Sequence, residues 1–121
     1  MNHFKLESFS CPCCDLNNIS IKLTDMLDEA RELAGIPFMV NSGCRCKKHN
    51  ARIGGSASSS HITTEKVECT ATDIACRSSR DRMLMLQAMI QVGFRRIGIG
   101  KTFIHVDVDE AKDQNVVWNY G

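Results

Sequence analysis

The chain has 121 residues, of which 43% are hydrophobic and 24% are charged, and its formal net charge is +1. This composition is typical of a soluble globular protein, and the length suits one domain with one core. A net charge this close to zero provides no electrostatic attraction to nucleic acid or to membrane surfaces, so neither is expected as a partner. We expect a single monomeric domain over residues 1–121, with residues 1–17 as a cysteine-containing opening segment.

Seven cysteines are many for so short a chain, and an odd number cannot all pair internally. They form the groups CPCC and CRC and a later pair that flanks Asp73. The two groups together could hold a structural zinc ion, form one disulfide between their loops, or remain free buried thiols. The later pair, Cys69 and Cys76, could bridge the base of an inserted hairpin. The candidates for a second metal site or a disulfide are Cys11, Cys14, Cys44 and Cys46.

Two main helices are predicted from apolar residues at helical spacing. The first begins after a cap at Asn17 or Asn18 and runs to about Ala34. The second begins after Ser78, and its run of methionine, leucine and isoleucine is apolar nearly all round, which predicts a well-buried helix. A shorter helix is expected at residues 47–53.

Short strands account for the other apolar segments. The segment NVVWNY is expected to be a third strand or an edge strand that presents Trp118 and Tyr120 on one face, where they could form either a cleft wall or part of the core. The predicted strands lie at residues 38–41, 71–76, 95–101, 102–108 and 115–120.

Histidine and carboxylate side chains concentrate in the segments SSHITTEKVECTATDIAC and FIHVDV. Alternation in FIHVDV puts His105 and Asp107 on one face of a strand and aliphatic residues on the other. Asp73 lies among small and apolar residues, where an unpaired charge is costly to bury. Sets of histidine and carboxylate ligands hold zinc in hydrolases, with one position left to water. With His61, these residues therefore form a candidate metal site.

The runs SGCRCKKHN, GG, SSHITTEKVECTATD and FIHVDV together resemble the zinc D-Ala-D-Ala carboxypeptidase-like family of peptidoglycan peptidases, of peptidase M15 type. The likeness is to its short phage and bacterial branch, which shares a metal-binding core with hedgehog signalling domains, and it covers roughly residues 9–120. It implies a single-domain α+β fold with a small antiparallel sheet and two main helices. It also implies zinc-dependent hydrolysis of an amide bond in peptidoglycan stem peptides or cross-bridges, as in D,D-carboxypeptidases, D,D-endopeptidases and L-alanyl-D-glutamate peptidases.

Roles follow from the resemblance by motif position. The signature S-x-H-x-x-G-x-A-x-D and a second signature H-x-D imply that His61, Asp73 and His105 hold one catalytic Zn²⁺. Ser59 stands at the leading serine of the first signature, in a loop that lines the substrate cleft. Arg45 stands where relatives have an arginine near the substrate's carboxylate, which a guanidinium can hold with two parallel hydrogen bonds.

Two features depart from the family pattern. Residues 62–70 make the spacer between the first histidine and the aspartate longer than in the signature, and a cysteine stands where the signature has a glycine. No carboxylate occurs in GIGKTF before His105, where several relatives have their general base. This leaves Asp107 as the candidate base, with Glu65 or Glu68 in reserve. Alternatively, Asp107 orients His105 through a hydrogen bond, as carboxylates commonly do beside metal ligands.

Two other functions remain open from the sequence: a catalytically inactive zinc-binding relative that acts as a binding or structural module, for example in a phage virion, and an interaction module built on cysteine-bound zinc. The segment MNHFKLESFSC has neither the basic start nor the apolar run of a signal peptide. A peptidase of this kind is therefore expected in the host cytoplasm, as an endolysin, or in a virion, and would reach the cell wall by another route.

Overall fold

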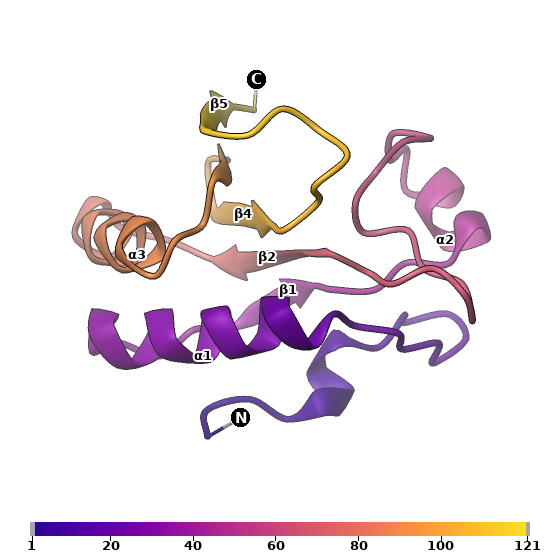
Figure 1. Cartoon of the computed structure of the whole chain (residues 1–121), viewed down its shortest axis with the longest axis horizontal. Coiled ribbons are helices and arrows are strands. Elements are labelled where there is room, and N and C mark those ends of the chain that lie inside the picture. Colours follow the sequence, from indigo (N-terminus) through magenta and orange to yellow (C-terminus); the bar gives the residue numbers. More distant parts are fainter. Residues whose placement is uncertain (1, 121) are drawn as a thin grey trace.

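The computed structural model describes residues 2–120 and shows one five-stranded sheet, with two main helices against one of its faces (Figure 1). The strand order is β1-β2-β4-β3-β5, and every neighbouring pair is antiparallel except β3 and β5. The fold is therefore the expected α+β class with a mostly antiparallel sheet. The elements are a 3₁₀ helix at Leu6–Phe9, α1 at Ile21–Ala34, β1 at Val40–Ser42, α2 at Lys47–Arg52, β2 at Ala71–Ala75, α3 at Ser79–Gln91, β3 at Arg96–Ile99, β4 at Phe103–Asp107 and β5 at Val116–Asn119.

Strand register lines up one row of residues across the sheet. Asp73 on β2 is opposite His105 on β4, His105 is opposite Gly98 on β3, and Gly98 is opposite Trp118 on β5. Ser42 on β1 completes the row beside Asp73. Paired residues present their side chains on the same face. Two strands far apart in sequence thus bring a carboxylate and an imidazole together.

The opposite face of the sheet carries the core. Ile74, Ile104 and Val106 are fully buried there, together with Leu27 of α1 and Met89 of α3. The alternation expected for FIHVDV is confirmed, since the aliphatic side chains enter the core while His105 and Asp107 share the other face. One face of the sheet therefore stabilises the fold and the other is free for chemistry.

The cap of α1 differs from the prediction. Ser20 caps the helix by accepting a hydrogen bond from the Leu23 amide (3.2 Å), and the helix ends at Gly35 with φ 69°. Asn17 is unavailable for capping because its side chain bonds the Leu6 carbonyl oxygen (2.8 Å). Asn18 bonds the Thr64 carbonyl oxygen (3.1 Å) instead. Local propensity favours asparagine as a helix cap. Both asparagine side chains form tertiary hydrogen bonds instead, so neither caps α1.

The prediction that the second helix is well buried holds for only one of its sides. Ser78 caps α3 as predicted, accepting from the Asp81 amide at 3.1 Å. Met85 and Met89 are buried, but Met83 is 58% exposed because only one side of α3 packs against α1 and the core. None of the helices within residues 2–120 is long and apolar enough to cross a membrane.

We predict a sharp contrast between two methionines of α3. Met89→Ala should lower the free energy of unfolding by about 2–5 kcal/mol, because it removes a fully buried side chain and leaves a cavity. The matched change Met83→Ala should alter it by less than about 0.5 kcal/mol. Denaturant unfolding of both variants measures the difference. Equal losses would contradict the burial pattern of this helix.

Candidate metal centre

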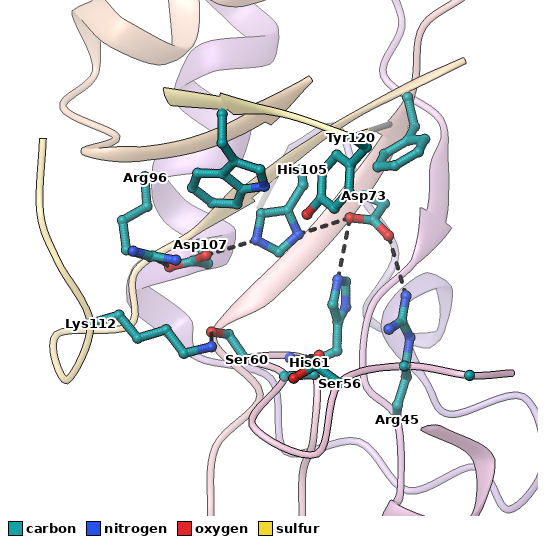
Figure 2. A pocket seen from close by; sticks show the side chains of 15 residues that line it. Arg45, Ser56, Ser60, His61, Asp73, Arg96, His105, Asp107, Lys112 and Tyr120 are labelled. Atoms are coloured by element: carbon teal, nitrogen blue, oxygen red, sulfur yellow. Dashed lines mark hydrogen bonds and ion pairs between the residues drawn. The ribbon is translucent and has the colours of Figure 1, made fainter. Parts of the chain in front are cut away.

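Three side chains, which we call the metal triad, converge at the polar face of the sheet (Figure 2). They are His61 from the loop after α2, Asp73 from β2 and His105 from β4, and one ligand atom of each lies within 4.8 Å of the others. Asp73 Oδ1 is 3.2 Å from His61 Nε2 and 3.0 Å from His105 Nδ1. The structure thus brings together the three residues that the sequence resemblance implied as ligands.

The outer contacts of both histidines fix which nitrogen carries hydrogen. His61 Nδ1 is 2.7 Å from the Gly43 carbonyl oxygen, which can only accept, so this nitrogen donates. His105 Nε2 is 2.7 Å from Asp107 Oδ2 and donates in the same way. In the neutral rings, the nitrogens facing Asp73 therefore carry lone pairs.

Three acceptor atoms accordingly face one another in a buried place. Both histidines are nearly inaccessible, at 3% and 6% exposure. Acceptors without a hydrogen between them repel, and a cation shared among them removes the repulsion. Histidine and carboxylate ligands of this kind suit zinc. The donor set therefore fits a metal ion.

Without a metal ion, a proton between Asp73 and a histidine can take the place of the cation, and the pKa values of the site reflect this. Burial opposes ionisation of Asp73, but hydrogen bonds with His105 and His61 hold the pKa of its carboxyl well below the usual range. Burial likewise opposes the charge of Asp107, whose pKa is lowered by His105 and by the nearby Arg96. Burial alone would lower the pKa of His105, yet its hydrogen bonds with Asp107 and Asp73 raise it. Both carboxylates are therefore ionised at neutral pH.

Asp107 lies on the far side of His105 from the rest of the metal triad. Its Oδ2 accepts from His105 Nε2, and its Oδ1 accepts from Arg96 Nε (2.7 Å) and the Asp109 amide (3.1 Å). The imidazole ring thus separates this carboxylate from Asp73, as Figure 2 shows. Of the two roles considered for Asp107, these contacts favour orienting His105 over accepting a proton from the reaction. Glu65 and Glu68 are exposed in the spacer and do not line the cavity at the triad.

Arg45 and Ser59 both line this cavity. Arg45 Nη2 is 3.3 Å from Asp73 Oδ2, and its Nε and Nη1 donate to Ser42 Oγ (3.0 Å) and Asn50 Oδ1 (3.4 Å). Ser59 Oγ accepts from the His61 amide at 3.2 Å. Each residue expected at the substrate therefore also holds a member of the metal triad in place.

The long spacer at residues 62–70 leaves the ligands undisturbed. The Thr70 amide donates to the Ser60 carbonyl oxygen at 3.0 Å, which closes the spacer at its base. Inside it, a turn joins the Thr64 amide to the Val67 carbonyl oxygen (3.0 Å). The extra residues loop out between two fixed ends, so they add length without separating His61 from Asp73.

The cavity beside the metal triad has a volume of about 360 Å³. Trp118 and Tyr120 line it, so these aromatic residues form a cleft wall. The Trp118 ring lies 5.4 Å from the His105 ring. Gly98 makes this approach possible, because a Cβ there would lie 2.6 Å from Tyr120 and 2.7 Å from Trp118.

Two cationic residues of the cavity wall, Arg96 and Lys112, were missed in the sequence. Strand pairing could have revealed the first: with Gly98 opposite His105, antiparallel register sets Arg96 beside Asp107. Lys112 lies in the connection from β4 to β5. No sequence signal marks it, because a lysine in a polar loop is ordinarily solvated.

The structure narrows the alternatives that the sequence leaves open for the cysteines. All seven are free thiols, so neither proposed disulfide is formed. Cys69 and Cys76 stand at opposite ends of the extended strand β2, too far apart to bond. Cys44 is buried, with its Sγ 3.6 Å from Asn17 Oδ1, and does not belong to the surface group. The group that could hold a metal is Cys11, Cys13, Cys14 and Cys46.

Two imidazoles and one carboxylate that converge beside an open cavity are the donor set of a metal-dependent hydrolase. The chain belongs to the peptidase M15 family, whose model matches residues 2–109. This match confirms the resemblance drawn from the sequence and includes the whole metal triad. No curated protein matches the chain. The protein is thus an M15 metallopeptidase-family member with a candidate His-His-Asp metal site, for which the family implies zinc.

We predict that Asp107→Asn weakens zinc binding at the metal triad by about 10–100-fold, because the carboxylate that orients His105 is lost while every ligand is kept. Competition with a chromophoric chelator measures the affinity. Asp113→Asn makes the same chemical change at an exposed position and should leave the affinity unaltered. Unchanged affinity in Asp107→Asn, with turnover abolished, would instead assign Asp107 the role of general base.

Proposed function

We propose that the protein is a zinc-dependent peptidase that hydrolyses an amide bond in a peptidoglycan stem peptide or cross-bridge. Family membership supports a peptidase, and the donor set supports a metal site. The observation that carries the proposal is the metal triad's place in the lining of a cavity that also presents cationic and aromatic side chains. Stem peptides carry free carboxylates, which such side chains can bind.

Two cationic groups can receive a substrate carboxylate. Arg45 uses one N–H on each of its three nitrogens within the protein, which leaves hydrogen-bond donors on both Nη atoms for a bidentate contact. Lys112 Nζ is fixed by the Ser58 carbonyl oxygen (2.6 Å) and Ser60 Oγ (2.8 Å). Lys112 Nζ also lies 3.7 Å from Asp109 Oδ2, and its side chain is 32% exposed, so this held ammonium group can still meet a substrate carboxylate in the cavity.

Zinc held by His61, Asp73 and His105 would supply a water nucleophile at neutral pH and a Lewis acid for the scissile carbonyl. The protein's own groups orient the metal ligands and provide a hydrogen-bond donor for this chemistry. Gly43 and Asp107 hold the two histidines in the tautomers that ligation needs. Burial raises the pKa of Tyr120, so its hydroxyl stays protonated and can donate to the carbonyl oxygen as negative charge develops there.

One observation favours a second candidate, an inactive zinc-binding relative that recognises peptidoglycan without cutting it. Among residues 2–120, the carboxylates that line the cavity of the metal triad are Asp73 and Asp107. The first is a triad member, and both oxygens of the second are engaged by His105, Arg96 and a backbone amide. A carboxylate free to accept a proton is therefore missing from this lining, although a peptidase ordinarily uses one.

An assay on purified peptidoglycan separates the two candidates. Zinc-loaded protein should release new amino groups, a chelator should abolish the release, and added zinc should restore it. The products identify the bond: free D-alanine marks a D,D-carboxypeptidase, conversion of cross-linked dimers to monomers a D,D-endopeptidase, and a new amino-terminal D-glutamate an L-alanyl-D-glutamate peptidase. Binding to peptidoglycan by zinc-loaded protein without any release would support the inactive relative.

Variants of the metal triad provide the matched test. His61→Ala and Asp73→Ala should reduce hydrolysis to the level of the metal-free protein, because each removes a ligand that nothing nearby replaces. Asp113→Asn, at an exposed position, should retain full activity. Circular dichroism verifies that the variants are folded. Activity that survives the loss of either ligand would refute a triad-bound metal as the catalyst.

A further inference from the structure

We propose that Cys11, Cys13, Cys14 and Cys46 bind a second zinc ion, in a structural site that ties the opening segment to the chain around the catalytic centre. Their four sulfur atoms, which we call the thiol cluster, lie within 4.8 Å of one another. Cys13 Sγ is 3.6 Å from Cys11 Sγ and 3.3 Å from Cys46 Sγ. A tetrahedral site with Zn–S bonds of about 2.3 Å needs sulfur separations of about 3.8 Å. The observed spacing is thus close to the spacing that zinc requires.

The backbone is already folded to present these sulfurs. The Asp15 amide bonds the Cys11 carbonyl oxygen (2.9 Å), and Asp15 has φ 60°, so CPCC forms a tight turn. The Cys46 amide donates to Cys11 Sγ (3.4 Å), and the His49 amide donates to Cys46 Sγ (3.4 Å). Amide donors of this kind favour the thiolate form that zinc binds.

The thiol cluster contrasts with the other three cysteines. Cys44, Cys69 and Cys76 are buried and pack within or beside the apolar core. Cys13 and Cys14 are exposed, so packing does not explain their convergence. Four thiolate ligands complete the tetrahedral shell of zinc and leave no open position, which is the arrangement of a structural site.

The position of the thiol cluster explains what such a site stabilises. Cys46 ends the segment Gly43–Cys46, in which the Gly43 carbonyl oxygen receives the His61 ring and the Arg45 amide bonds the His61 carbonyl oxygen (2.8 Å). The Cys44 amide bonds the Phe9 carbonyl oxygen (2.8 Å). Between the short 3₁₀ helix and α1, the opening segment has no helix and no sheet strand. Zinc would therefore cross-link two otherwise irregular segments next to the metal triad.

Metal content measured on the purified, reduced protein tests this proposal independently of any peptidase activity. Elemental analysis should give two zinc ions per chain in the wild type. Cys13→Ser and Cys14→Ser change exposed residues and should each leave one zinc, which the metal triad holds. His61→Ala should also leave one, held by the thiol cluster, and the combination with Cys13→Ser should leave none. The zinc content of these variants therefore distinguishes a missing thiol-cluster site from a missing triad site.

Cys44→Ala is the matched control, because Cys44 lies in the same CRC motif but outside the thiol cluster. It should keep both zinc ions. Replacing zinc by Co²⁺ in His61→Ala should produce the strong sulfur-to-metal charge-transfer absorption of a tetrathiolate site, and this absorption should be missing when Cys13 is also changed.

A measurement on the unmodified protein covers the case in which a cysteine variant does not fold. Four thiols should resist alkylation in the native zinc-loaded protein and react once a chelator removes the metal. One zinc ion per wild-type chain with Cys13 and Cys14 freely alkylated would overturn the proposal. So would a mass two daltons lower that maps to a Cys13–Cys46 disulfide in protein kept under reducing conditions.

Discussion

A single carboxylate oxygen, Asp73 Oδ1, lies 3.2 Å from His61 Nε2 and 3.0 Å from His105 Nδ1, and the polar face of the sheet is organised around this contact. Strand register sets Asp73 opposite His105, while Gly43 and Asp107 turn the hydrogen-bearing nitrogens outward. With neutral rings the contact is unfavourable unless a metal ion or a proton is shared among the three atoms, so packing of the core must help to hold these groups together. The aliphatic face of the same strands provides that packing, since β2 and β4 are fully buried on their other side.

Each buried carboxylate of the site has its own arginine. Asp73 is 3.3 Å from Arg45, and Asp107 is 2.7 Å from Arg96. An ionised carboxylate without a partner is costly to bury, so these pairs keep the site charged and folded before any ligand arrives. The pairing also gives Arg45 a second role. A residue that the sequence suggests for substrate recognition is at the same time a structural partner of a metal ligand.

The metal triad could be predicted from the sequence because the strand alternation and the motif positions correspond directly to the positions of these side chains in the fold. The role of Asp107 could not, since it depends on which nitrogen of His105 faces Asp73. Cys44 was wrongly grouped with Cys46 because residues two apart in sequence need not point to one side: one enters the core and the other caps α2. The exposure of Met83 was missed for a related reason, because an apolar run does not reveal which face of a helix will meet a partner.

The segment Gly43–Cys46 joins the metal triad to the thiol cluster. Within four consecutive residues, it contacts His61 and Asp73 of the metal triad through Gly43 and Arg45, and it supplies Cys46 to the thiol cluster. Cys46 is therefore only three residues from the carbonyl oxygen that fixes the tautomer of His61. A segment this short has few ways to absorb a backbone shift, because a Cβ on Gly43 would already lie 2.8 Å from the backbone of Phe9. The opening segment, whose cysteines take no part in the proposed chemistry, thus has a physical reason to be held firmly: it is the surface against which the ligand-bearing backbone is packed.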